Sequence, residues 1–317
     1  MCQVGDPMAD YSLDFQVSHD EQAESCSIRF RCFDTPNEVT VYGSMGDPHA
    51  AERLLLDARA MCLELHRLWS FSLPCSDIAR LNAGSGRIAV DSRTADILAL
   101  MKGFHEIEPA FDFTIGPVSY LWKRASRLPS QGEIAEAMAH VGAGKVSVDG
   151  RVVVKDDPFA QVDVGGAAKG YAADALVDLF RARGIACADI DLGGNLYLLG
   201  SHLEGRPWRV SVRVPEGVSV DPIVVEVMDG AAVTSGSYER FVEIGGVRYQ
   251  HIIDARNGWP CESDVISATV FAKSALQADL LATTACLLGS RGFAGLVERH
   301  PDCHFVVITS DGTVMRS

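Results

Sequence analysis

Apolar residues recur at helical spacing in several stretches of the chain. Between Pro48 and Trp69 they form one continuous face, made by Leu54, Leu55, Ala58, Met61, Cys62, Leu65 and Leu68. Steps of three and four residues predict a long amphipathic helix there. The same spacing predicts helices over Ser92–Glu108, Ser130–His140, Tyr171–Arg183 and Ala275–Leu288, and a short helix within Ser70–Asn82 with Ser76 as its N-cap.

Short runs of apolar and β-branched residues between these helices predict strands. Two strands are expected within Ser27–Gly43, around Thr35-Pro36-Asn37, and a hairpin within Val146–Val154, around Asp149-Gly150. Others are expected over Ile185–Leu192, Trp208–Val214, Ile223–Met228 and Val265–Ala272, and twice within Glu298–Met315, whereas Phe111–Trp122 is expected to be an aromatic loop.

Strands and helices mix without a strict βα alternation, which favours an α+β fold of mixed sheets with flanking helices. We expect residues 1–25 to be a loosely ordered segment, because they are mostly polar. Residues 26–317 contain no internal repeat or low-complexity linker, so we expect one integrated domain.

Composition narrows the class of protein. A net charge of −14 argues against a nucleic-acid partner. The nine cysteines are odd in number and form no Cys-x-x-Cys pair, which indicates free thiols in a reducing compartment. No apolar run is long enough to predict a transmembrane segment. Residues 1–20 lack the pattern of a signal peptide, so we expect a cytoplasmic location, although a leader removed earlier is compatible with the same residues.

One unit, Val162 to Gly200, combines a glycine pair, a lysine, a helix and a second glycine pair. Gly165 and Gly166 lack a Cβ, so backbone there can approach a ligand closely. A glycine turn at a helix N-terminus favours a phosphate group, and Lys169 is a nearby cation. The segment alone is equally compatible with a packed strand-turn-helix-strand unit in which the glycines serve only the turns.

Asp279 and Thr283 interrupt an otherwise apolar helix and lie four residues apart, so they share one face. A carboxylate beside a hydroxyl suits a hard cation such as Mg²⁺, which takes its other ligands from phosphates, carbonyls and water. The alternative, which the pair in isolation favours, is that Asp279 accepts a hydrogen bond from Thr283 or caps a turn.

Three other places offer polar groups. His251 follows an expected strand and could act as a base or orient a substrate, and a bend at Asp254 could bring the two side chains together. The alternative is a strand-end histidine with an Asx-type turn at Asp254. Arg256 could pair with a phosphate or be solvated. Thr234–Tyr238 is expected to be a hydroxyl-rich turn that hydrogen-bonds a ligand or only backbone. Asp112 and Thr114 lie among aromatic residues that could flank a flat heterocycle or belong to the core.

These motifs, in this order, resemble the ApbE-type FAD:protein FMN transferase family over roughly Phe30 to Gly289. The resemblance rests on Ser76–Asn82, Phe111–Thr114 with Gly116-Pro117, Asp163–Asp174, Gly193-Gly194, Thr234–Arg240, His251–Asp254 with Gly258, and Ala278–Thr283. The chain departs from the family pattern at Phe33-Asp34-Thr35 in place of Met-Gly-Thr, at Phe113 in place of Pro, and at Ala255 and Asn257 in place of Pro and Thr. It shows no lipobox, unlike the exported members of the family.

The resemblance implies an enzyme that binds FAD and Mg²⁺ and moves FMN onto a Ser or Thr hydroxyl of a target flavoprotein, releasing AMP. It implies that Asp279 and Thr283 ligate Mg²⁺ with the backbone carbonyl of Gly166. Lys169, Asp163 and His251 are the candidate catalytic residues, with His251 or Asp163 as the base. The FAD-binding residues that it implies are Phe33, Ser72, Phe111, Asp112, Thr114, Asp163, Lys169, Ser235, Gly236, His251 and Ile253.

Two other functions remain compatible with the sequence. In an FAD pyrophosphatase, water would replace the acceptor hydroxyl and give FMN and AMP. In a non-catalytic FAD carrier or sensor, FAD would remain intact.

Overall fold

The computed structural model describes residues 14–43, 48–202, 205–237 and 241–317. Its largest element is a nine-stranded sheet in the order β1-β2-β3-β7-β8-β11-β16-β17-β18, in which every neighbouring pair is antiparallel. The strands are β1 Phe15–Asp20, β2 Ser25–Cys32, β3 Thr35–Tyr42, β7 Ala188–Leu192, β8 Asn195–Leu199, β11 Gly230–Gly236, β16 Val265–Ala272, β17 His304–Thr309 and β18 Val314–Arg316.

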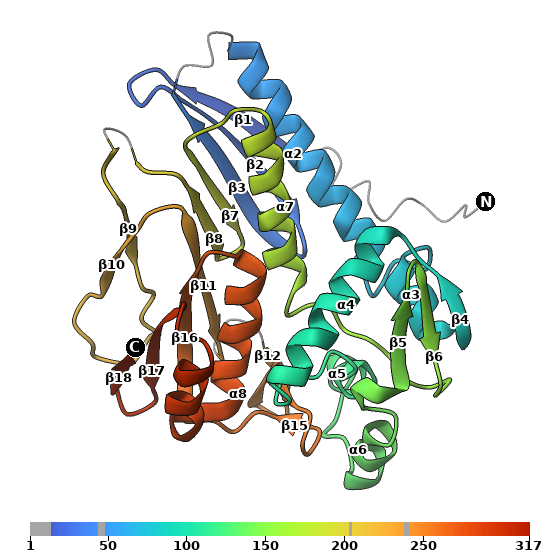
Figure 1. Cartoon of the computed structure of the whole chain (residues 1–317). Coiled ribbons are helices and arrows are strands. Elements are labelled where there is room, and N and C mark those ends of the chain that lie inside the picture. Colours follow the sequence, from blue (N-terminus) through green and yellow to red (C-terminus); the bar gives the residue numbers. More distant parts are fainter. Residues whose placement is uncertain (1–13, 44–47, 203–204, 238–240) are drawn as a thin grey trace.

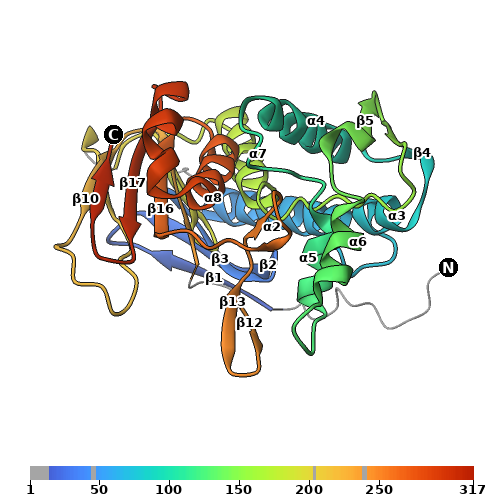
Figure 2. The same cartoon turned by 90° about the horizontal axis from the view of Figure 1, so that it is seen from below.

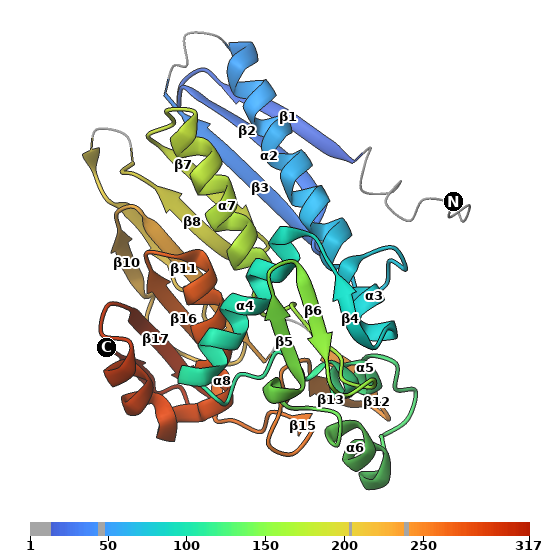
Figure 3. The ribbon, with the colours of Figure 1, turned by 45° about the vertical axis from the view of Figure 1, so that its right-hand side comes forward.

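Three long helices cover one face of this sheet, as Figures 1 and 3 show: α2 Pro48–Trp69, α7 Ala168–Ala182 and α8 Ala275–Arg299. The main core lies between them and the sheet. Leu54, Leu55 and Leu65 of α2 are buried there, as the amphipathic pattern predicts. α8 is the one described helix that is long and apolar enough to span a bilayer by length and composition, and half of its apolar window is buried inside the protein.

A smaller group of elements stands beside the sheet and carries part of the site. Its helices are α3 Asp77–Ala83, α4 Ser92–Ile107, α5 Gly116–Lys123 and α6 Gln131–Met138, with a 3₁₀ turn at Ala143–Lys145. Its three-stranded sheet has the order β4-β6-β5, with β4 Gly86–Ala89, β5 Val146–Asp149 and β6 Val152–Lys155. The remaining two-stranded ribbons are β9 Trp208–Ser211 with β10 Val224–Val227, β12 Phe241–Ile244 with β13 Val247–Gln250, and β14 Ile253–Asp254 with β15 Trp259–Pro260.

Most expected elements are confirmed, and the mixture of sheets and helices is the α+β class. Ser76 caps α3 by accepting from the Ala79 N–H, as expected. Gly289 has φ 67° and interrupts α8 where the predicted helix ends, but a second helical segment continues to Arg299.

Four expectations were wrong in place or type. Residues 15–20 of the segment expected to be loosely ordered form β1, paired along its length with β2, whereas residues 1–13 lie outside the described part. The turn between β2 and β3 is Phe33-Asp34, both with positive φ, as a two-residue hairpin requires. Thr234–Gly236 belongs to strand β11, and the expected loop 111–122 contains α5, which Gly116-Pro117 begins.

Candidate functional site

Two adjoining cavities lie where the glycine turn before α7 meets α5 and α8. One, of about 200 Å³, is lined by Asp112, Asp163, Gly166, Ser235, His251, Asp279 and Thr283 among others, and we call it the aspartate cavity. The second, of about 490 Å³, is lined by Phe33, His66, Trp69, Phe71, Ser72 and Tyr120 among others, and we call it the aromatic cavity. Lys123, Asp163, Gly165 and Lys169 line both, so we treat the two as one cleft.

The glycine turn supplies backbone to the floor of this cleft. The Gly165 N–H donates to Asp163 Oδ1 at 2.8 Å, and α7 begins three residues later at Ala168. A Cβ on Gly166 would lie 3.2 Å from Phe111 Cε2 and 3.7 Å from Thr283 Oγ1. Gly166 is therefore the point where bare backbone faces the hydroxyl of α8, which supports the functional interpretation of the glycine pair.

Asp279 and Thr283 both point into the aspartate cavity, as their spacing predicts. Asp279 is only 4% exposed, and its Oδ2 accepts a hydrogen bond from the Gly170 N–H at 3.1 Å. A Cβ on Gly170 would lie 2.6 Å from the Ala275 carbonyl oxygen. The absence of a side chain at Gly170 thus lets α7 and α8 approach closely enough for Asp279 to reach the glycine turn.

Asp174 holds the same two helices together from the opposite direction, a role that the sequence analysis missed. Its carboxylate accepts from Ser274 Oγ at 2.6 Å, from the Ala275 N–H at 2.7 Å and from the Leu276 N–H at 3.0 Å. An α7 carboxylate therefore caps the N-terminus of α8, where negative charge is favoured. The sequence feature that could have indicated this role is the position of Asp174 at the end of the Asp163–Asp174 motif, five residues after Lys169.

Asp163 is held as an anion. Burial by itself raises the pKa of this carboxyl, but the Lys123 ammonium, the Gly165 N–H and Ser119 outweigh burial and bring it below its ordinary value. Lys123 Nζ lies 3.3 Å from Asp163 Oδ2. An ionised carboxylate with a low pKa is a weak proton acceptor, so Asp163 suits an electrostatic role better than that of a base.

Lys123 and Ser119 were not among the expected site residues. Both belong to α5 and lie four residues apart, so they share a helix face as Asp279 and Thr283 do. Gly116-Pro117 could have indicated both residues, because a proline at the first positions is common at the start of a helix.

Lys169 lies in the first turn of α7 and donates from Nζ to the Gly193 carbonyl at 3.2 Å. Gly193 has φ +62°, and a Cβ there would lie 2.5 Å from Thr35. The second glycine pair therefore lets the start of β3 come close and presents a carbonyl oxygen that orients the Lys169 ammonium toward the cleft.

His251 directly follows β13 and lines the aspartate cavity with an exposed side chain. The Asp254 side chain does not line this cavity with His251. Its carboxylate accepts from the Arg256 N–H at 2.8 Å and from the Arg256 guanidinium at 2.6 Å, so it makes the Asx-type turn given as the alternative. Gly258 has φ +76° and a Cβ there would clash with Ile134, which explains the glycine that ends this motif.

Two expected FAD-binding residues do not line either cavity. Thr114 is fully buried, donates from Oγ1 to Asp112 Oδ1 at 2.6 Å and accepts from the Gly142 N–H, so it fixes the Asp112 side chain. Gly236 is buried at the end of β11. Ser235, one residue earlier, does line the cavity, and its Oγ lies 3.4 Å from Thr283 Oγ1. Phe111, Asp112 and Ile253 line it as expected.

The aromatic cavity is walled by rings and cations. Phe71 and Tyr120 have ring centroids 4.5 Å apart, with Lys123 Nζ 5.6 Å from the Phe71 centroid and the Arg124 guanidinium 4.0 Å from that of Tyr120. Such walls suit a planar heterocycle that carries negative charge nearby. Of this cavity, the sequence predicted Phe33, Ser72, Asp163 and Lys169.

The turn at Phe33 is anchored by a histidine. The Phe33 N–H donates to His66 Nδ1 at 3.1 Å, which requires this nitrogen to be unprotonated. Burial lowers the pKa of His66, despite the Asp34 carboxylate nearby, and so favours this neutral form.

The donors of the aspartate cavity suit a hard divalent cation. Within the described residues, no three His, Cys, Asp or Glu side chains gather in a metal-binding arrangement. Asp279, Thr283 and the backbone at Gly166 instead form a small set of oxygen donors beside an open cavity. That incomplete set fits Mg²⁺, which binds through one or two carboxylates and completes its shell with phosphate and water oxygens.

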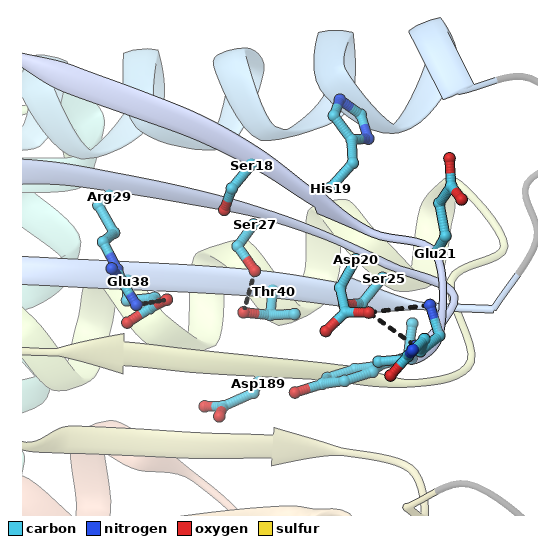
Figure 4. A pocket seen from close by; sticks show the side chains of 13 residues that line it. Ser18, His19, Asp20, Glu21, Ser25, Ser27, Arg29, Glu38, Thr40 and Asp189 are labelled. Atoms are coloured by element: carbon cyan, nitrogen blue, oxygen red, sulfur yellow. Dashed lines mark hydrogen bonds and ion pairs between the residues drawn. The ribbon is translucent and has the colours of Figure 1, made fainter.

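A third and larger depression, of about 680 Å³, lies on the other face of the sheet over β1, β2, β3 and β7 (Figure 4), and we call it the sheet hollow. Its side chains mainly pair with one another, as in Ser27–Thr40 at 2.9 Å and Arg29–Glu38 at 2.9 Å. It contains no expected site residue. Burial, then repulsion from Asp191 and Glu38, raises the pKa of Asp189 in this hollow to about 7.

Comparisons with known proteins show which family the chain resembles. A model of the ApbE family matches residues 33–307. The FAD:protein FMN transferase of Vibrio cholerae is 33% identical over 250 residues, which cover 75% of this chain and 74% of that protein. The FAD:protein FMN transferase of Treponema pallidum is 36% identical over 266 residues, 76% of this chain and 73% of that protein.

Solved structures give the same result for the fold. The ApbE protein of Thermotoga maritima superposes with a TM-score of 0.83 at 26% sequence identity, covering 96% of this chain and 97% of that one.

Proposed function

The chain belongs to the ApbE family, and from this premise we propose that it transfers FMN from FAD to a Ser or Thr hydroxyl of an acceptor flavoprotein and releases AMP. The observation that carries the proposal is the meeting of Asp279 and Thr283 with the glycine turn inside a two-part cleft. FAD has a planar ring system at each end and a diphosphate between them. A cleft of two cavities joined at Lys123, Lys169 and Gly165 matches that shape and charge.

We propose that Asp279, Thr283 and the Gly166 carbonyl hold Mg²⁺. A bound divalent cation would neutralise part of the diphosphate charge. The Lys169 ammonium and the N–H groups of the glycine turn add fixed positive potential at the same place, which favours charge that builds up on the departing AMP.

His251 is the better candidate for the base, because it is exposed in the cavity whereas Asp163 is paired with Lys123. In the proposed step, the acceptor oxygen forms a bond to the FMN phosphorus and its proton passes to His251. The phosphorus–oxygen bond to AMP breaks, so one phosphoester replaces one phosphoanhydride bond.

The test is to incubate the protein with FAD, Mg²⁺ and a peptide that carries a flavinylation Ser or Thr, and to weigh the peptide. A mass increase equal to an FMN phosphoester supports transfer. Release of free FMN and AMP without that increase would identify a pyrophosphatase, and intact FAD after hours in Mg²⁺ would identify a carrier. The eight described cysteines are free thiols, which supports our further proposal of a cytoplasmic location.

A further inference from the structure

The hairpin β12–β13 stands out from the body of the protein (Figure 2). Gly245 and Gly246, with φ of 60° and 78°, form its tip. An isolated two-stranded hairpin is marginally stable in water, so its base must be supported by other elements. That base is supported by the rings of Tyr249 and Trp122, whose centroids are 5.3 Å apart.

The two faces of this hairpin differ. Pairing of Val242 with Tyr249 and of Ile244 with Val247 places one apolar face partly against α5 and α6. Phe241, Glu243 and Arg248 lie on the other face and are exposed. Phe241 is 42% exposed, and the Arg248 guanidinium lies 4.4 Å from its ring centroid. An exposed aromatic residue with an arginine over its ring is typical of a binding surface, where both residue types are enriched.

The hairpin is continuous with the candidate active site. His251 follows β13 directly and lines the aspartate cavity. Trp122, which supports the hairpin, is adjacent to Lys123, which lines both cavities. A molecule seated on the hairpin would therefore extend over the mouth of the cleft.

The charges on and near the hairpin indicate what kind of partner binds there. The whole chain carries a net charge of −14, yet Lys123 and Arg124 line the aromatic cavity. Arg248 is exposed on the hairpin, where its Nε lies 3.8 Å from Glu243 Oε2. Complementary charge steers association and sets orientation. An acidic surface on the partner would be attracted here and repelled by most of the rest of the molecule.

We propose that β12–β13, together with the Lys123-Arg124 end of α5, is the docking surface for the acceptor protein. The partner is a folded domain whose modified hydroxyl lies beside acidic and apolar side chains. This inference rests on the proposed transferase function, because it assigns a place to the second substrate of that reaction.

The test compares a protein acceptor with a peptide. Reaction of the wild-type protein with FAD, Mg²⁺ and cell extract marks the acceptor as a band with covalent fluorescent flavin, and that acceptor is then purified. Phe241→Ser and Arg248→Glu should each raise the KM for the purified acceptor about tenfold, with kcat and FAD affinity unchanged. The same variants should modify a short peptide around the flavinylated residue at the wild-type rate, because the peptide does not reach the hairpin.

Matched controls are Leu100→Ala, an exposed apolar residue of α4, and Arg209→Glu, an exposed arginine of β9, and both should keep the wild-type KM. Wild-type KM values in both hairpin variants, or an equal loss with protein and peptide, would overturn the docking surface. Failure of the wild-type protein to label any acceptor or peptide would instead overturn the transferase function itself.

Discussion

The cleft and the sheet hollow are both polar depressions, but their side chains come from different kinds of places in the chain. The hollow is lined by neighbouring strands and a turn, and along β2 and β7 its residues alternate with buried ones. The cleft is lined from a glycine turn, α5, α8, β11 and the end of β13, which are far apart in sequence. In the hollow, Ser27 pairs with Thr40 and Arg29 with Glu38, but Asp189 Oδ1 has no hydrogen-bond partner among the described residues. In the cleft, a close backbone approach places the Asp279 carboxylate against the Gly170 N–H. Volume does not distinguish the two regions, because the hollow measures about 680 Å³ and the two cavities of the cleft measure about 490 Å³ and 200 Å³.

Asp279→Asn gives the strongest test of the difference between the cleft and the hollow. The amide oxygen can still accept from the Gly170 N–H, but the negative charge is lost. We expect FMN transfer to fall at least about 100-fold, with the melting temperature within a few degrees of wild type. Transfer assays at saturating Mg²⁺, with calorimetry alongside, measure both quantities. Wild-type transfer would remove Asp279 from the metal site.

Gly170→Ala tests the close approach of α7 and α8. Its Cβ would meet the Ala275 carbonyl oxygen and Leu276 Cα, both at 2.6 Å, so the helices must separate. We expect a loss of about 2 kcal/mol in the free energy of unfolding and a fall in transfer. The control is Gly103→Ala in α4, where a Cβ meets nothing within 4 Å and should stabilise the helix by up to about 1 kcal/mol. Denaturant unfolding of the two variants separates steric conflict from helix propensity.

Asp189→Asn probes the hollow through pH. The folded pKa is about 7, whereas the unfolded carboxyl titrates near about 4. Because the raised pKa belongs to the folded state, the stability that Asp189 contributes is full below pH about 4 and is lost as the pH rises through 7. At pH 8 the neutral asparagine should therefore stabilise the protein by about 1–3 kcal/mol, with no change near pH 4 and unchanged transfer. An equal effect at both pH values would contradict the burial of this charge.

Ser27→Ala should have the smallest effect. It removes one partly buried hydroxyl pair with Thr40 and should cost about 0.5–1 kcal/mol in unfolding free energy without altering transfer. A large loss of transfer would mean that the hollow shares the function of the cleft.

Features that depend on a single period or a local motif were predictable from the sequence. The bounds of α2 and of β16 agree with the apolar pattern. Burial of one helix face fixes the extent of α2, and burial of a continuous apolar run fixes the extent of β16. The i,i+4 pair Asp279 and Thr283 was recognisable for the same reason.

Contacts between distant segments could not be predicted in this way. The partners of Asp174 lie about 100 residues later, and no local pattern indicates which N–H groups it caps. Lys123 could be placed in the site only if α5 was predicted as a helix. The many aromatic residues of this stretch indicated a loop instead. Asp254 could have joined His251 or formed a turn, and only the Arg256 contacts decide between them.

The hydrogen bond between Gly170 and Asp279 joins residues 109 positions apart, and the hydrogen bonds of Asp174 join residues 100 to 102 positions apart. During synthesis, the glycine turn therefore leaves the ribosome long before the carboxylate that completes it. A nascent chain that ends before α8 has the glycine turn and Gly170 but no Asp279 to accept the hydrogen bond. Competence to bind the dinucleotide should thus arise late, as one of the last events in the maturation of the polypeptide.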